Sequence, residues 1–224
     1  MATATISLFW AKPSQVLDGV NLLVDRSIRR EKILTFIPGR TILSGSRMIG
    51  RPSGPFISKA DWKKSFAYYD LVLKAAAELI SFYLEPTGNV RRPKLMNALA
   101  QALLWFHEGC RETVTLMAIV KLTATLDALA KGDQSGGIKR LVTARLGHKP
   151  SDKFWADGTS MEQAVKEIYS DGRSRTIHGT NDKLGHDWTS TRARTEALSR
   201  LCLILCMEWA SSNPTLDNPA LLQK

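Results

Sequence analysis

From about residue 58 onward, apolar positions recur every three or four residues, the spacing that places side chains on one face of an α-helix. Short stretches rich in glycine, proline or polar residues separate these periodic segments. The segments predicted as helices are 60–83, 93–110, 114–130, 138–146, 159–177 and 189–209. Neither an internal repeat nor an alternation of strands with helices accompanies them, so we expect an all-α bundle of five or six helices.

The N-terminal quarter of the chain follows a different pattern. Residues 15–23 have the composition of a short helix with Ser14 as its N-cap. Residues 35–51 then mix β-branched side chains with three glycines, which interrupts helical periodicity. The domain organisation predicted from these patterns is an irregular or partly extended segment at 1–56, a helical domain at 57–212 and a C-terminal tail at 213–224.

The charge balance adds a class of partner to this picture. Lys and Arg number 31 against 21 Asp and Glu, so the formal net charge is +10 at pH 7. An excess of positive charge favours a polyanionic partner, and nucleic acid is the commonest polyanion. A basic surface that only improves solubility is the alternative that charge leaves open.

Cysteine usage and hydropathy indicate whether disulfides, a metal site or a membrane segment should be expected. Cys110, Cys202 and Cys206 show neither a disulfide framework nor the spacing of metal ligands, and the last two lie in an apolar run where cysteine acts as a small hydrophobe. The longest apolar run, 201–207, is too short to cross a bilayer, and the N-terminus lacks the pattern of a secretory signal. We therefore expect a cytoplasmic protein without membrane contact.

The segment 173–179 carries the most chemistry. Arg173 stands five positions before His178, and Gly179 follows the histidine directly. An arginine can hold a phosphate, and a histidine can transfer a proton near pH 7. Gly179 is expected to end the helix, which places His178 in its last turn, where the helix dipole favours the imidazolium. A surface arginine and a histidine that only stabilises its helix end are the plain alternatives.

The spacing of the two side chains has a geometric consequence. Five residues of α-helix turn through about 500°, so Arg173 and His178 would lie about 140° apart around an ideal helix. Both can face one cleft only where the helix ends or is distorted, or where a second chain completes the site.

This segment resembles the Arg-x4-His-Gly signature of HEPN ribonuclease domains, in particular the ApeA-like branch, over about residues 60–210. Two further features carry the resemblance. An aromatic-rich helix around Trp105 precedes an apolar helix ending in 126–129 (Leu-Asp-Ala-Leu), where the family usually has Leu-Glu-x-Leu. Tyr169 matches the family's tyrosine, although one extra residue, within a stretch that includes Gly172, separates it from the arginine. The resemblance implies a HEPN-type bundle and a homodimer whose two motifs face one groove.

The resemblance also implies a chemistry, that of a metal-independent endoribonuclease without a cofactor. Arg173 would hold the phosphate, His178 would deprotonate the 2′-hydroxyl or protonate the leaving 5′-oxygen, and Ser174 would orient one of them. The products would be a 2′,3′-cyclic phosphate and a 5′-hydroxyl. The residues predicted to contact RNA are Arg175, Asn181 and Lys183. A zinc site at His178 and His186 would lack further ligands at a suitable spacing.

Proteins of this family commonly act as toxins in antiphage defence, where they cut RNA and halt growth in abortive infection. The resemblance therefore implies RNA, a second copy of the chain and a regulatory or antitoxin protein as partners. Two other functions fit the same residues. One is a non-catalytic HEPN module that binds RNA or protein, and the other is a structural helical domain whose basic charge serves an acidic partner.

Overall fold

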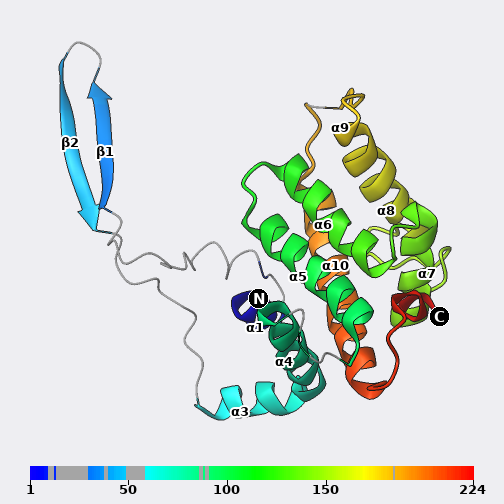
Figure 1. Ribbon diagram of the computed structural model, residues 1–224. Helices are drawn as coiled ribbons and strands as arrows, with labels where there is room; N and C mark the ends of the chain where they lie inside the picture. Colours follow the sequence, from blue (N-terminus) through cyan, green and yellow to red (C-terminus); the bar gives the residue numbers. More distant parts are fainter. Residues whose placement is uncertain are drawn as a thin grey trace.

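The computed structural model describes residues 1–9, 13, 30–37, 40–48, 59–85, 88, 91–183 and 185–224. Helices dominate the described chain and form a bundle, which confirms the predicted all-α class (Figure 1). The helical elements are α1 (Ala2–Ser7), α3 (Lys59–Tyr68), α4 (Asp70–Leu84), α5 (Pro93–Arg111), α6 (Thr115–Leu129), α7 (Gln134–Leu146), α8 (Met161–Lys166), the π-helix η1 (Glu167–Ser174), α9 (Arg175–Ile177), α10 (Thr189–Ser212) and the 3-10 helix η2 (Pro219–Gln223).

The core lies between α4, α5, α6 and α10, with α5 and α6 as neighbouring helices and α10 packed across them (Figure 1). Their inward faces carry fully buried leucine, alanine and phenylalanine side chains, as the three- and four-residue spacing predicts. Gly109 allows α5 and α6 to approach closely, because a Cβ on it would lie 2.7 Å from Cγ of Leu122. Cys202 and Cys206 are buried in this core, as expected for small hydrophobes.

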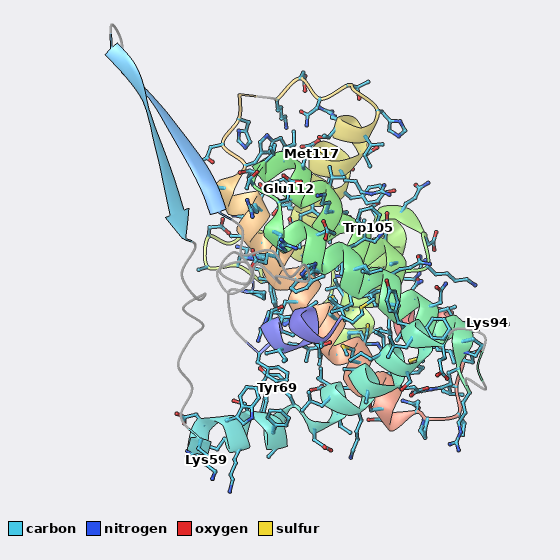
Figure 2. The ribbon with its side chains drawn as sticks, turned by 60° about the vertical axis from the view of Figure 1, so that its left-hand side comes forward. Lys59, Tyr69, Lys94, Trp105, Glu112 and Met117 are labelled. Carbon is cyan, nitrogen blue, oxygen red and sulfur yellow. The ribbon has the colours of Figure 1, made fainter. Side chains whose placement is uncertain are left out.

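The single helix predicted for 60–83 is wrong, because the chain forms two helices that meet at Tyr69 (Figure 2). Tyr69 leaves helical geometry, with φ −99° and ψ 20°. Its ring stacks on Phe9 with centroids 4.3 Å apart, and its hydroxyl accepts a hydrogen bond from Arg200 at 3.4 Å. These contacts to segments distant in sequence explain the break, which helical periodicity alone does not reveal.

The fourth helix begins earlier than predicted, since α7 starts at Gln134 although 131–137 reads as a loop. The start depends on Gly137, whose absent side chain lets the first turn approach the end of α6. A Cβ there would lie 2.8 Å from Cβ of Asp133 and 3.2 Å from Cβ of Ala130. A glycine is expected to interrupt a helix in a sequence-based prediction, but Gly137 allows α7 to begin here.

The N-terminal residues contribute two separate elements. The first helix, α1, packs on α4 and α5, and Leu8 is fully buried. A two-stranded antiparallel hairpin, β1 (Arg30–Ile37) and β2 (Arg40–Met48), is an addition to the helical bundle. The helix predicted at 15–23 lies outside the described residues.

The C-terminal residues, predicted as a tail, are fastened to the bundle. Arg145 on α7 donates hydrogen bonds to the carbonyls of Leu221 and Leu222, at 2.8 and 2.9 Å. Asp217 accepts a hydrogen bond from the Leu95 amide at 2.9 Å, which satisfies a free N–H of the first turn of α5. The segment 217–219 is thereby held beside α5.

A buried arginine joins three helices at the same end of the bundle. Arg92 is 2% exposed, forms an ion pair with Glu78 on α4, and donates to the carbonyls of Ala210 and Asn213 at the end of α10. A cation at a helix C-terminus is stabilised by the helix dipole. No helix within the described ranges has both the length and the apolar character needed to span a membrane.

Candidate functional site

The helix that carries the Arg173–Gly179 segment changes its geometry partway along. It begins at α8 with a capping box between Ser160 and Gln163, one residue after the predicted start at 159. It then becomes the π-helix η1 and returns to α geometry only for α9. A π-helix carries more residues per turn than an α-helix and is frequent at functional sites. It can therefore absorb the extra residue counted between Tyr169 and Arg173.

Gly172 sets how closely η1 approaches α6. A Cβ on Gly172 would lie 2.7 Å from Cγ2 of Ile119, which is closer than side chains tolerate. Gly172 and Ile119 are both buried. The glycine that is unusual inside a predicted helix therefore has a reason, namely close contact between the motif helix and α6.

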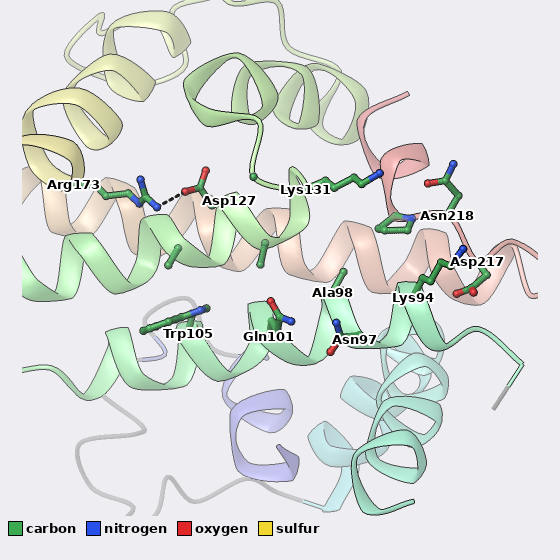
Figure 3. A pocket seen from close by; sticks show the side chains of 14 residues that line it. Lys94, Asn97, Ala98, Gln101, Trp105, Asp127, Lys131, Arg173, Asp217 and Asn218 are labelled. Atoms are coloured by element: carbon green, nitrogen blue, oxygen red, sulfur yellow. Dashed lines mark ion pairs between the residues drawn. The ribbon is translucent and has the colours of Figure 1, made fainter. Parts of the chain in front are cut away.

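Arg173 points toward α6 and forms an ion pair with Asp127, with Nη2 2.8 Å from Oδ2 (Figure 3). Its Nη1 donates to the Tyr169 hydroxyl at 3.2 Å, and its guanidinium lies 5.1 Å from the centre of the Tyr169 ring. Two residues of the motif helix thus meet an aspartate from the separate Leu-Asp-Ala-Leu segment in one cluster. Asp127 was not predicted as a site residue, although its Leu-Asp-Ala-Leu segment was noted as a family feature.

The cluster is largely removed from water, since the side chains of Arg173 and Asp127 are only 26% and 13% exposed. Burial raises the pKa of the Asp127 carboxyl, and the positive charge of Arg173 partly opposes that rise. Two buried atoms, Oδ1 of Asp127 and Nε of Arg173, have no hydrogen-bond partner among the described residues. Asp127 and Arg173 are joined by one direct contact, and each keeps one polar atom that can form a hydrogen bond with another group.

An open groove of about 920 Å³ runs from this cluster along α5 to the C-terminal segment (Figure 3). One wall is α5 and the other is formed by the end of α6, the turn after it and Arg173. The polar and aromatic side chains that line the groove are Lys94, Asn97, Gln101, Trp105, Asp127, Lys131, Arg173, Asp217 and Asn218. The groove was not predicted, because it depends on how α5, α6 and 217–219 meet.

His178 lies at the end of α9 in a Schellman arrangement, which confirms the helix end predicted at Gly179. Gly179 has φ +67°, the Thr180 amide donates to the Arg175 carbonyl at 2.9 Å, and the Gly179 amide donates to the Thr176 carbonyl at 3.2 Å. The His178 side chain is exposed, and its imidazole has no hydrogen-bond or ion-pair partner among the described residues. It is therefore open to solvent or to another molecule.

Within one chain, Arg173 and His178 form no hydrogen bond with each other. Arg173 ends the turn that faces α6 and the groove, while His178 occupies the exposed helix end. The angular separation of about 140° assumed α geometry throughout. That angle does not apply to this helix, because the π-helix η1, which has more residues per turn, extends to Ser174. Ser174 is partly buried, and its hydroxyl has no hydrogen-bond partner among the described residues.

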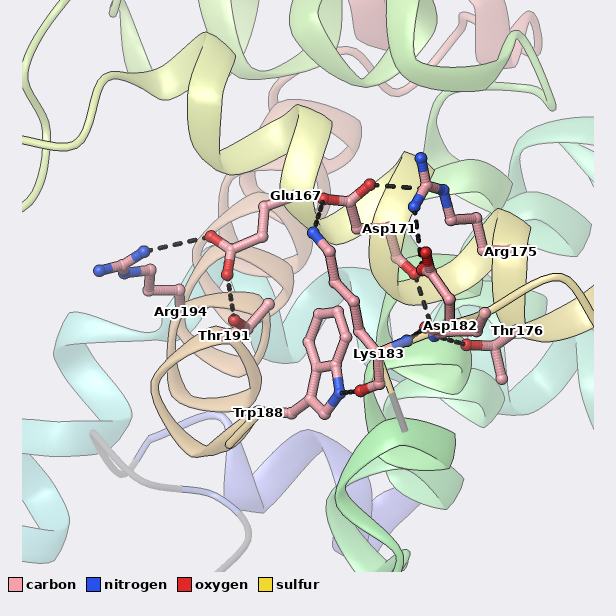
Figure 4. Close-up of polar contacts among 10 residues, drawn as sticks. Glu167, Asp171, Arg175, Thr176, Asp182, Lys183, Trp188, Thr191 and Arg194 are labelled. Carbon is pink, nitrogen blue, oxygen red and sulfur yellow. Dashed lines mark hydrogen bonds and ion pairs between the residues drawn. The ribbon is translucent and has the colours of Figure 1, made fainter. Parts of the chain in front are cut away.

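The residues predicted to bind RNA take part in a polar network at the helix end (Figure 4). Arg175 pairs with Asp182 at 3.3 Å and lies 3.7 Å from Asp171, and Lys183 pairs with Asp171 at 3.0 Å. Asn181 donates to the Thr176 hydroxyl at 2.8 Å and to the Asp171 carbonyl at 3.3 Å. These contacts fold residues 181–183 back onto η1 and α9.

A second set of contacts fixes η1 to α10. Glu167 accepts a hydrogen bond from the Thr191 hydroxyl at 2.5 Å and pairs with Arg194 at 3.3 Å (Figure 4). Arg194 also pairs with Asp157 before α8. The start of η1 is thus anchored on α10, while Gly172 and Arg173 anchor its end on α6.

Metal ligands do not gather in the described part of the chain: no group of three His, Cys, Asp or Glu side chains there has suitable geometry. Comparison of the chain with protein-family models, curated proteins and solved structures returns no match. The resemblance to HEPN domains therefore stays a prediction.

Proposed function

We propose that this chain is a metal-independent endoribonuclease of the HEPN type, in which two copies complete each active site. One observation carries the proposal: the Arg-x4-His-Gly segment ends a helix so that Arg173 lines a groove while the His178 imidazole is exposed and unpaired among the described residues. A phosphate ligand and a proton carrier are the two groups that cleavage of RNA by its own 2′-hydroxyl requires.

In the proposed reaction, His178 removes the proton from a ribose 2′-hydroxyl, and the 2′-oxygen attacks the adjacent phosphorus. The bond between phosphorus and the 5′-oxygen breaks, and the imidazolium returns the proton to that oxygen. The products are a 2′,3′-cyclic phosphate and a 5′-hydroxyl. Arg173 stabilises the charge that grows on the phosphoryl oxygens.

Asp127 and Tyr169 act as positioning residues in this scheme. They hold the Arg173 guanidinium through one contact at each terminal nitrogen. A guanidinium has five N–H donors, so N–H groups remain for a phosphate while both contacts persist. Fixing the orientation in advance lowers the entropy lost when the phosphate binds.

The second copy supplies the pairing that one chain lacks. Arg173 faces α6 and the groove while His178 occupies the exposed end of α9, so in this proposal a phosphate held by Arg173 meets the partner's His178. The net charge of +10 supports RNA as the substrate class. A toxin of antiphage defence, active in the cytoplasm and held in check by a regulatory or antitoxin protein, is the biological role that we propose.

A non-catalytic module that binds RNA is the second candidate function. Arg173 already contacts Asp127 and Tyr169, and these contacts are enough to explain the arginine as a structural residue that joins η1 to α6. This observation favours the second candidate. In that case the same groove would bind RNA and leave it intact, with an affinity that falls with salt.

Cleavage of labelled single-stranded RNA in EDTA separates the two candidates. We expect cleavage by the wild type and a loss of at least about 100-fold in Arg173→Ala and His178→Ala, as removal of a general acid–base group or a charge-stabilising donor gives. Arg111→Ala, at an exposed position, and His148→Ala, at a half-buried position after α7, are the arginine and histidine controls and should cleave within about threefold of wild type. Equal cleavage by wild type and both site variants would contradict the proposal, and intact RNA with measurable binding would favour the second candidate.

A further inference from the structure

Trp105 is the starting point, because a tryptophan this exposed is unusual on a bundle helix. Its side chain is 45% exposed on α5 and lines the groove (Figure 2). No other aromatic ring among the described residues stacks on it. An exposed indole at the wall of a groove offers a flat face on which a planar group can stack.

The same face of α5 continues as a row of polar side chains. Lys94, Asn97 and Gln101 precede Trp105 at spacings of three and four residues, so all four lie along one stripe of the helix (Figure 3). The side chains of these three polar residues have no hydrogen-bond or ion-pair partner among the described residues. The stripe therefore presents donors and acceptors to the groove rather than to the protein.

The opposite wall adds positive charge. Lys131 lines it with φ +56°, as the left-handed residue of the Schellman motif that ends α6, in which the Gly132 amide donates to the Asp127 carbonyl at 2.8 Å. Its ammonium group has no ion-pair partner within the described ranges. Lys94, Lys131 and Arg173 stand against Asp127 and Asp217, which leaves the groove with a net charge of +1. Asp127 is already paired with Arg173, so the charges without an ion pair are the two lysines and Asp217, which accepts from the Leu95 amide, and the lysines outnumber it.

We infer that this groove binds a short segment of single-stranded RNA, with one base stacked on Trp105 and phosphates of the strand held by Lys131 and by Lys94, which lies about 16 Å along α5 from Trp105. Gln101, one turn of α5 before Trp105, and Asn97, one turn further, offer amide groups that can hydrogen-bond to the edges of bases along the strand. The volume of about 920 Å³ is at the upper end for pockets that hold small ligands, so it accommodates a nucleotide. An apolar ligand would leave the polar stripe unsatisfied. The inference rests on the proposed function and adds the place where the RNA strand next to the cleaved bond lies.

Fluorescence anisotropy with a 5′-labelled 12-residue oligouridine tests the groove separately from cleavage. The His178→Ala protein is the background, in EDTA, so that the probe stays intact. Trp105→Ala should weaken binding by about 5- to 150-fold, the range that corresponds to loss of one stacked base. Lys131→Ala should weaken it and also lower the slope of log affinity against log salt by about 0.7, one phosphate contact of a single strand.

Control variants keep the result independent of general charge and folding. Tyr83→Ala removes an exposed aromatic ring from α4, and Lys149→Ala removes an exposed lysine after α7; both should bind as the background does. Trp105→Phe keeps a flat ring and should stay within about threefold, which answers the case in which Trp105→Ala fails to fold. A duplex RNA should bind at least tenfold more weakly, because its bases are already stacked.

Unchanged affinity in Trp105→Ala and Lys131→Ala would contradict binding of single-stranded RNA in the groove. A duplex that binds as tightly as oligouridine would contradict it as well. Competition by polyglutamate at the same charge concentration would overturn the nucleotide in favour of an acidic peptide. The proposed function is tested by the separate cleavage assay. RNA that binds in the groove but is never cut would support the binding site and contradict the ribonuclease activity.

Discussion

Replacing Gly172 by alanine tests whether the motif helix packs against α6 at a position where only glycine fits. The new Cβ would lie 2.7 Å from Cγ2 of Ile119, inside the buried contact between η1 and α6. Overpacking of a well-packed interior costs about 1–3 kcal/mol. The gain in helix propensity from glycine to alanine returns about 0.5–1 kcal/mol. We therefore expect Gly172→Ala to lower the free energy of unfolding by about 1–2 kcal/mol.

The sign of that effect should depend on the residue at 119. Ile119→Ala removes Cγ2 and leaves Cβ, which is 3.8 Å from the new methyl group, an ordinary contact. In that background, Gly172→Ala should stabilise the protein by about 0.5–1 kcal/mol, because only the propensity gain remains. Ile119→Val is the matched control: it keeps Cγ2, so Gly172→Ala should remain destabilising there.

Urea denaturation followed by circular dichroism measures all six proteins of this cycle. Ile119→Ala alone should cost about 2–5 kcal/mol and Ile119→Val about 0.5–1.5 kcal/mol, and neither value affects the comparison within a background. An equal cost of Gly172→Ala in the wild-type and Ile119→Ala backgrounds would refute the contact as the reason for the glycine.

Two further predictions concern the groups at either end of the motif. Because burial raises the pKa of Asp127 above its ordinary value of 3.8, the folded protein keeps a proton there that the unfolded chain has released, so this group's contribution to stability falls as pH rises through that window. Urea denaturation at several pH values should show Asp127→Asn gaining stability relative to wild type as pH rises above the ordinary pKa of 3.8; a shift the other way would contradict the assigned cause. Gly179→Ala should lower stability by about 1 kcal/mol, because φ +67° is unfavourable for a residue with a Cβ even though that Cβ meets no neighbour, and thermal denaturation should show Gly179→Asn losing less. Equal losses in the two variants would mean that the left-handed backbone is not the cause.

The bundle followed from the sequence wherever helical periodicity and local caps decide the structure. The bounds of α5 and α6 lie within one or two residues of the predicted 93–110 and 114–130. Ser160 and Gly179 mark the two ends of the motif helix as their residue types predict. In each case the determining contacts lie within a few residues in the chain.

The differences have tertiary causes. The break at Tyr69 depends on Phe9, sixty residues earlier in the sequence, and the early start of α7 depends on the close approach of Gly137 to Ala130. The two ends of the π-helix η1 contact α10 and α6 through residues that are distant in sequence. No periodic pattern records such contacts.

The candidate site shows the same division. Arg173 and His178 were visible as residue types at a suggestive spacing, and the Leu-Asp-Ala-Leu segment was visible as a second motif. Their relation was not, because the ion pair between Arg173 and Asp127 joins residues 46 positions apart. The groove along Trp105 likewise appears only when α5, the end of α6 and the C-terminal segment are placed together.

Mixing two inactive variants tests the central claim most directly. Arg173→Ala and His178→Ala chains would be unfolded together, refolded and assayed on labelled single-stranded RNA, beside each variant treated alone. If the site combines Arg173 of one chain with the partner's His178, half of the chains in a random mixture form mixed pairs with one intact site, and cleavage should return to about a quarter of the wild-type rate. A mixture as inactive as its components, beside an active wild type, would contradict a site shared by two chains.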